Sequence, residues 1–175
     1  MKHAHSLKLS VFSYEYENSR NILDGFLRFF PFSLEENKIG IKNATAAGFN
    51  ESKIGILEVT LTKASLISRF IQNILEKLDE WQKNLILEQI GSRLDCNLDF
   101  FLRFDKSSWI DDKKLVLTDT GKCFHIKMSV AAFPRKREVA LNIVKELFQN
   151  KGLSTLGRGT FAKSSTKNVP LMARK

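Results

Sequence analysis

Histidine and cysteine are scarce in this chain of 175 residues, and neither is placed for binding a metal ion. The three histidines stand at positions 3, 5 and 125, and the two cysteines, Cys96 and Cys123, form no CxxC pair. A structural zinc site usually needs four such ligands at short spacings, so we expect no metal and no cofactor. The cysteine spacing leaves a disulfide possible, but two reduced cysteines are the favoured interpretation.

Long hydrophobic runs are also missing. No run approaches the roughly 18 apolar residues that a membrane span requires. Residues 1–5 read Met-Lys-His-Ala-His, and no long apolar stretch of a secretory signal follows them. We therefore expect a cytoplasmic protein with no membrane partner.

Catalytic motifs are missing as well. The sequence contains no GxSxG, HExxH or phosphate-loop pattern. Asp111, Asp112 and Asp119 fall in predicted turns, where aspartate commonly bonds to the local backbone, whereas a metal-dependent nuclease needs carboxylates that cluster. We therefore expect no catalytic residues and no enzymatic activity.

Acidic residues are missing from the last part of the chain, residues 151–175, which contains six lysines and arginines. This segment carries six of the nine net positive charges, so the other 150 residues share the remaining +3. Its glycine, serine, threonine and lysine content predicts a basic, flexible tail after a single domain at 1–150. Because most of the charge lies in the tail, net charge alone does not show that the folded part binds nucleic acid.

Hydrophobic periodicity predicts that strands and helices are mixed along the chain. Alternating apolar residues predict strands at 6–14, 38–45, 53–62, 98–105, 114–117 and 122–133. Apolar residues at helical spacing predict helices at 19–30, 65–78, 80–93 and 135–149. Neighbouring strands without a helix between them pair antiparallel, so the expected fold class is α+β, a mixed or antiparallel sheet with helices packed on one face.

The same alternation predicts the side chains on the sheet face away from the helices. They are Lys8, Ser10, Phe12, Lys42, Thr60, Lys127 and Ser129, with Glu58 and His125 among them. Strand 98–105 adds either Phe101 and Arg103 to this face or, in the other orientation, Leu98, Phe100, Leu102 and Phe104. Lysines neutralise phosphates and rings stack on unpaired bases, as single-stranded RNA would require. Any solvated sheet face has a similar composition, so both interpretations stay open at this point.

Two apolar strands end in basic residues. The first reads Phe101-Leu102-Arg103-Phe104-Asp105-Lys106, and the second ends in Phe133-Pro134-Arg135-Lys136-Arg137. Positive charge in the first turn of a helix opposes the helix dipole. The basic residues at 135–137 therefore suggest an anion nearby, with the helix amides as further ligands.

In this order of elements, the chain resembles an archaeal RNA-binding-domain family whose members are described as predicted exosome subunits and whose fold is similar to ribosomal protein L5. The resemblance covers about Ala4 to Phe148, and its anchors are the two strand exits above and Ile56-Leu57-Glu58-Val59. The chain departs from the family at Thr45–Asn50, where a Thr-Glu-Gly-His-Tyr-Gly-Asn-type loop is usual. The acid and the histidine are missing here, and Phe49 stands at the aromatic position.

Residues and resemblance together predict a non-enzymatic RNA-binding module of low sequence specificity, associated with RNA processing or the exosome. The predicted RNA-binding residues are Lys8, Lys42, Arg103, Lys106, Lys127, Arg135, Lys136 and Arg137, and the predicted stacking rings are Phe49 and Trp109. Two alternatives stay open: an adaptor between proteins of an RNA-processing or ribosomal assembly and, with less support, an RNA-processing hydrolase. Exosome or ribosomal proteins are the partners that these hypotheses imply, and the oligomeric state is not defined by the sequence.

Overall fold

The computed structural model describes residues 2–47 and 53–149. Within these residues, five strands form one antiparallel sheet in the order β2-β3-β1-β5-β4. The strands are β1 (Ala4–Tyr14), β2 (Lys42–Ala47), β3 (Lys53–Leu61), β4 (Asp99–Asp105) and β5 (Cys123–Val130). The predicted α+β class with an antiparallel sheet is confirmed. The predicted tail at 151–175 and the predicted stacking ring Phe49 lie outside the described residues, and the division at residue 150 stays a prediction.

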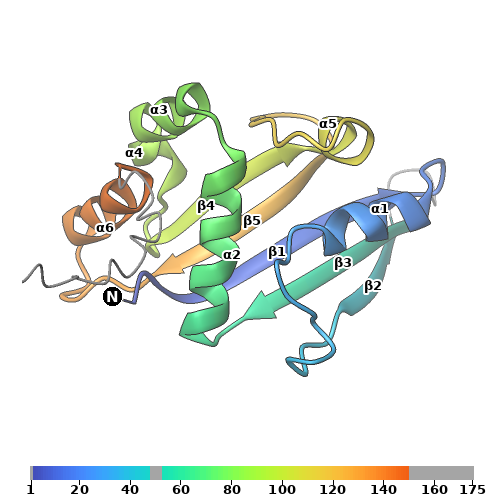
Figure 1. Cartoon of the computed structure of the whole chain (residues 1–175), viewed down its shortest axis with the longest axis horizontal. Coiled ribbons are helices and arrows are strands. Elements are labelled where there is room, and N and C mark those ends of the chain that lie inside the picture. The colour runs from blue at the N-terminus through green and yellow to red at the C-terminus, as the bar shows by residue number, and fades with distance from the viewer. Residues whose placement is uncertain (1, 48–52, 150–175) are drawn as a thin grey trace, which may run out of the picture.

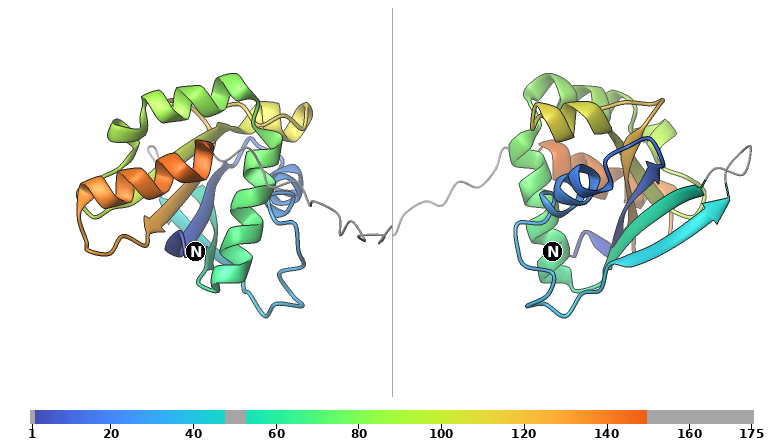
Figure 2. Two further views of the ribbon diagram at one scale, coloured as in Figure 1. Left: turned by 60° about the vertical axis from the view of Figure 1, so that its left-hand side comes forward. Right: turned by 90° about the vertical axis from the view of Figure 1, so that its right-hand side faces the viewer.

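Helices cover one face of this sheet. They are α1 (Ser19–Leu27), α2 (Ala64–Lys77), α3 (Glu80–Glu88), α4 (Ile90–Arg93), α5 (Lys106–Asp111) and α6 (Arg137–Gln149). Helices α1, α2 and α6 lie on the same side of the strands (Figures 1 and 2). The other face of the sheet is therefore open over much of its area.

The sheet alternates between its two faces as the sequence predicts. Leu7, Leu9 and Val11 of β1 are buried under the helices, and their partners on β5 are Met128, Ile126 and Phe124. Even-numbered residues of β1 and odd-numbered residues of β4 and β5 therefore point to the open face. This register places Phe101 and Arg103 on the open face and resolves the alternative left by the sequence.

Aromatic rings dominate the core between the sheet and α1. The ring of Phe29 lies 4.9 Å from that of Trp109 and 5.0 Å from that of Phe124, measured between centroids. Phe70 of α2 and Phe104 of β4 complete the cluster. Burial of such large apolar rings is the main driving force that holds the helices to the sheet.

Several predicted elements differ in detail. The predicted helix at 80–93 divides at Gln89, whose ψ of 7° interrupts the helical geometry between α3 and α4. The segment predicted as a strand at 114–117 makes one isolated bridge, from Leu117 to Phe104. Helix α5 was missed by the periodicity because it is short and begins with a cap, in which Asp105 accepts a hydrogen bond from Ser108 N at 2.7 Å.

The cysteines are unpaired in this structure, with Cys96 exposed and Cys123 half-buried. This agrees with the favoured interpretation of two reduced thiols. Among the helices of the described residues, none is both long enough and apolar enough to cross a membrane.

Candidate nucleic-acid interface

A row of polar side chains crosses the open face from one edge to the other. Register partners place Lys42 beside Glu58, Glu58 beside Ser10, Ser10 beside His125 and His125 beside Arg103. A second row contains Thr60, Lys8, Lys127 and Phe101. The predicted residues of this face thus lie together, although they come from five different strands.

Three cations surround His125 at the centre of the open face. Burial lowers the pKa of His125, and the nearby cations Arg103, Lys8 and Lys127 lower it further. The imidazole ring stacks on Phe101, with centroids 5.5 Å apart and 15° between the planes. A neutral histidine among three cations is what a surface prepared for anions would contain.

Two of these lysines form ion pairs within the face. Lys8 Nζ lies 2.9 Å from Glu58, and Lys127 Nζ lies 2.6 Å from Asp99. The hydrogen bond to Asp99 raises the pKa of Lys127. Both lysine side chains keep more than a third of their surface exposed, so each pair contributes little to stability and its lysine can turn to a phosphate.

The open face deepens into a groove where β1 ends and β5 begins. The groove has a volume of about 470 Å³. Its lining residues are Ser10, Phe12, Tyr14, Arg103, Lys106, Asp119, Thr120, Gly121, Lys122, Cys123 and His125. It therefore combines aromatic rings, cations and backbone from strands that are distant in the sequence.

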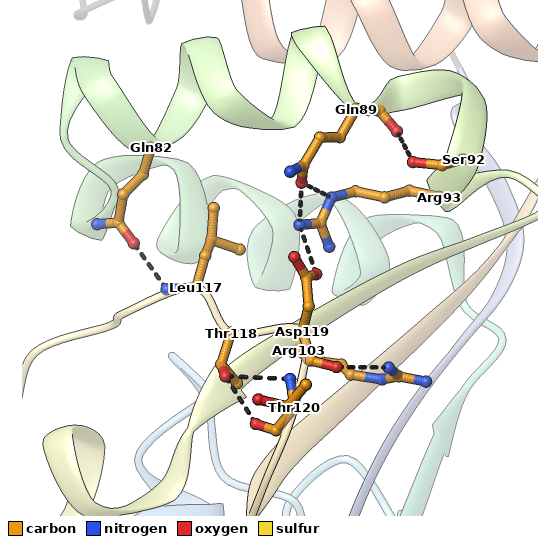
Figure 3. Close-up of polar contacts among 9 residues, drawn as sticks. All are labelled: Gln82, Gln89, Ser92, Arg93, Arg103, Leu117, Thr118, Asp119 and Thr120. Carbon is orange, nitrogen blue, oxygen red and sulfur yellow. Dashed lines mark hydrogen bonds and ion pairs between the residues drawn. The ribbon is translucent and has the colours of Figure 1, made fainter.

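One wall of the groove is the loop before β5, and α4 holds this loop in place. Arg93 Nη2 donates to Asp119 Oδ1 at 3.1 Å, while Gln89 Oε1 accepts from the same guanidinium (Figure 3). On the other side, Arg103 Nη1 donates to the carbonyl oxygen of Asp119 at 3.2 Å. Because that carbonyl is neutral, the bond orients Arg103 without cancelling its charge.

Three further hydrogen bonds fix the same loop. Gln82 Nε2 donates to Leu115 O at 3.0 Å, and Leu117 N donates to Gln82 Oε1 at 2.9 Å. Thr118 Oγ1 donates to the carbonyl of Thr120 at 2.7 Å, which closes a local turn (Figure 3). The loop is thus anchored at both ends, and the groove does not depend on a ligand to form.

Lys106 does not face the groove as a free cation, which corrects its prediction as an RNA-binding residue. Its side chain is only 4% exposed, and its Nζ donates to Phe12 O at 2.6 Å and to Glu17 Oε2 at 2.9 Å. Burial alone would raise the pKa of Glu17, but the hydrogen bonds from Tyr14 N and Lys106 lower it overall. The sequence predicts an exposed cation at the end of this strand, whereas the structure buries Lys106 at the start of α5.

Trp109 is a core residue, which corrects its prediction as a stacking ring. It is 1% exposed, and its Nε1 donates to Gly25 O at 2.8 Å. A Cβ atom at residue 25 would come within 3.0 Å of Ile110, so glycine allows α1 to approach α5 this closely. Trp109 lies in α5, a helix that the sequence analysis does not predict, and this helix directs the indole into the core.

The basic cluster at 135–137 divides into two roles. Arg137 donates to the carbonyls of Gly91 at 2.6 Å and Leu94 at 2.9 Å, at the C-terminal end of α4. Its positive charge at the start of α6 is therefore explained by the carbonyl end of another helix, which corrects the inference of an anion there. Arg135 and Lys136 are exposed, and Arg135 makes one long bond to Asn97 O at 3.3 Å.

Two residues of the groove, Tyr14 and Lys122, and the adjoining Tyr16 are absent from the site that the sequence predicts. Tyr14 and Tyr16 stack with centroids 5.6 Å apart, and Lys122 Nζ lies 4.3 Å from the Tyr16 centroid. A signal was present, because Phe12, Tyr14 and Tyr16 recur at every second residue. The predicted strand ends at residue 14, so alternation along it does not reach Tyr16.

An open antiparallel sheet with helices on one face and cations and rings on the other is an architecture suited to single-stranded nucleic acid. The comparisons with known proteins point to the same class. A family model described as RNA binding matches residues 6–130, and the chain belongs to this RNA-binding family.

The chain is similar in sequence to one archaeal protein and in fold to several others. The RNA-binding protein PAB1135 of Pyrococcus abyssi is 20% identical over 149 residues, which cover 85% of this chain and 96% of that protein. Among solved structures, protein AF2318 of Archaeglobus fulgidus matches with a TM-score of 0.73 and 28% identity, over 82% of this chain and 99% of that one. Mth689 of Methanothermobacter thermautotrophicus matches with a TM-score of 0.68 and 20% identity, over 84% and 99%.

Proposed function

We propose that this chain is a non-catalytic module that binds RNA on the open face of its sheet, with the groove between β1 and β5 as the main contact. The observation that carries the proposal is the position of Arg103. Its charge lies in the groove, oriented by a neutral carbonyl, beside a histidine whose pKa its own charge helps to lower. A phosphate group at this point would remove a repulsion that the unbound protein contains.

The chemistry of the groove favours low sequence specificity. Lysine and arginine contact phosphates, which every nucleotide carries, and aromatic rings stack on the faces of all four bases. The basic residues at 151–175 would then increase the rate of encounter with RNA through long-range attraction. Association with an RNA-processing assembly such as the exosome, or with ribosomal proteins, and a cytoplasmic location are parts of this proposal that rest on the resemblance and the composition.

The adaptor alternative has less support. Apart from Phe12 and Tyr16, large exposed apolar side chains occur in separate segments of the described part of the chain, at Leu27, Ile41, Trp81, Val116 and Phe133. A protein interface usually gathers such side chains into one patch. The groove gathers cations and rings instead, which favours a polyanion.

A salt titration with labelled single-stranded RNA tests the proposal on the full chain. The variant R103Q/K122Q removes two groove cations, and K77Q/K145Q removes two exposed lysines from α2 and α6 as a matched control. We expect R103Q/K122Q to weaken binding about tenfold or more. The slope of log affinity against log salt should fall by about 1.4, because each contact to a single strand contributes about 0.7. The control should bind like the wild type.

A further variant separates the groove from the basic tail. It carries glutamine at Lys151, Arg158, Lys163, Lys167, Arg174 and Lys175. Binding that survives this change but is lost in R103Q/K122Q supports the groove. Binding that is unchanged in R103Q/K122Q and lost in the tail variant would overturn the proposed site. Shortening of the RNA by the purified protein with Mg²⁺ would overturn the non-catalytic part of the proposal.

A further inference from the structure

Three aromatic side chains form a continuous series at the end of β1. Phe12 and Tyr14 occupy successive positions on the open face, and Tyr16 follows in the turn after the strand. The rings of Tyr14 and Tyr16 are nearly parallel, with 7° between their planes. Phe12 and Tyr14 line the groove, and Tyr16 extends the series beyond it.

The turn that presents Tyr16 is held by several bonds. Glu17 N donates to Tyr14 O at 2.9 Å, and Tyr14 N donates to Glu17 Oε2 at 3.0 Å. The same carboxylate accepts from the buried Lys106. Tyr16 is therefore oriented before any ligand arrives, which reduces the entropy lost on binding.

These rings are exposed although the protein has a large aromatic core. Tyr16 is 71% exposed and Phe12 is 51% exposed, on the face that the helices leave open. Aromatic residues favour strands, but neighbouring rings that are this exposed leave a contiguous apolar surface in contact with water. The exposed rings lie near one another at the end of one strand. This arrangement favours a ligand with flat apolar faces.

Cations adjoin the series. Lys122 Nζ lies 4.3 Å from the centroid of Tyr16 and 5.8 Å from that of Tyr14. Arg103 lines the same groove as Phe12 and Tyr14. Flat rings flanked by cations complement a ligand that alternates flat bases with phosphates, whereas a proline-rich peptide would match the rings but not the charge.

We propose that Phe12, Tyr14 and Tyr16 form a stacking platform for unpaired bases, with Lys122 and Arg103 on the flanking phosphates, so that the protein selects single-stranded over double-stranded RNA. The inference rests on the RNA-binding function proposed above. In a duplex the bases are already stacked on one another and their faces are not accessible to protein rings. The platform therefore supplies a preference for strand state without reading sequence.

The test compares a single-stranded RNA labelled with 2-aminopurine with a duplex of the same length, on the full chain. The variant F12A/Y16A removes the exposed rings, Y16F keeps a ring, and W81A removes an exposed ring on α3 as the matched control. We expect F12A/Y16A to lose about tenfold affinity per ring for the single strand. Its duplex affinity and the slope of its salt dependence should be unchanged, because no charge is removed. Y16F and W81A should bind like the wild type, and quenching of the 2-aminopurine should decrease in F12A/Y16A but not in these two variants.

The outcomes separate the platform from the function on which it rests. Wild-type protein that binds no RNA would overturn both. Wild-type protein that binds single strands while F12A/Y16A binds them equally well would overturn the platform alone. Equal wild-type affinity for duplex and single strand would overturn the proposed selectivity. A proline-rich peptide that displaces the RNA from the wild type but not from F12A/Y16A would assign the rings to a protein partner and overturn the platform.

Discussion

The ammonium group of Lys106 lies 2.9 Å from the carboxylate of Glu17, and this contact joins the start of α5 to the turn after β1. The two side chains are only 4% and 14% exposed. The ammonium also donates to Phe12 O on the neighbouring strand. The pair therefore supports the backbone of the strand end from which Phe12 and Tyr16 project.

Replacement of Lys106 by methionine should destabilise the protein strongly. The change leaves the Glu17 carboxylate and the Phe12 carbonyl without their main donor, in a place that water reaches poorly. Loss of one partner of such a pair typically costs about 3–5 kcal/mol, and we expect that decrease in the free energy of unfolding in urea. The exposed Lys114 is the matched control, and K114M should lie within about 0.5 kcal/mol of the wild type. A K106M protein as stable as K114M would contradict the structural role.

Glu17 should also make the stability depend on acid pH. Its pKa is lower in the folded protein than the ordinary value of 4.5, so its contribution is complete above that value. The contribution is lost as the pH falls through the lower folded pKa. Urea unfolding between about pH 3 and pH 7 should show a steeper decline on acidification for the wild type than for E17Q. Parallel curves for the two proteins would show that this carboxylate is not the responsible group.

Trp109 should matter for folding and not for RNA. The variant W109F keeps a ring in the core but leaves Gly25 O without its donor, which costs about 1–3 kcal/mol. RNA affinity at a temperature where the protein is folded should equal that of the wild type. The exposed Trp81 supplies the comparison, since W81F should change stability by less than about 0.5 kcal/mol. Loss of RNA affinity in W109F without loss of stability would return Trp109 to the list of stacking rings.

The sheet and its two faces could be predicted from the sequence because their causes are local. Alternation along β1 and β5 shows which residues are buried, and neighbouring strands without a helix between them pair antiparallel. Lys8, Ser10 and His125 could thus be assigned to one face, whereas Arg103 remained one of two alternatives. What the sequence leaves open is the register that sets Arg103 beside His125.

The errors concern side chains whose surroundings are set by distant segments. Lys106 follows a strand and is basic, as an exposed phosphate ligand would be, but Glu17 and Phe12 O lie 89 and 94 residues away in the chain. Arg137 binds the carbonyls of α4, which are more than 40 residues earlier. Hydrophobic periodicity contains no information on contacts between distant segments. The sequence therefore could not show which lysines and arginines are held by the protein and which are exposed.

Substitutions in the basic cluster at 135–137 should therefore have different effects: Arg137 should affect stability, whereas Arg135 and Lys136 should affect RNA binding. R137Q removes the bonds to the end of α4 and should lower the free energy of unfolding by about 1–2 kcal/mol, a range reduced for partial exposure. R135Q and K136Q should leave stability within about 0.5 kcal/mol, and each should lower the salt slope of RNA binding by about 0.7 if its cation contacts a phosphate. Urea unfolding and salt titration of the three variants check this. Equal stability of all three would contradict the role of Arg137.

RNA binding should depend on pH through His125. Burial lowers the pKa of this histidine in the free protein, and so do Arg103 on β4, Lys8 on β1 and Lys127 on its own strand. Phosphates bound in the groove would offset these cations and raise the pKa of the imidazole, so binding would take up a proton. Affinity should then increase as the pH falls from about 7.5 to 5.5, by up to about tenfold for each unit by which binding shifts the pKa.

The variant H125Q should remove this increase, while H5Q, at an exposed histidine outside the groove, should keep it. The opposite sign applies to folding: a lowered pKa means that the unfolded chain binds the proton more tightly, so stability decreases below the ordinary value of 6.5. The titrations must therefore be made where the protein is still folded. NMR of the imidazole protons with and without RNA gives the two pKa values directly. A pKa that is unchanged by RNA, or an affinity that falls on acidification in the folded protein, would place the phosphates away from His125 and away from the centre of the open face.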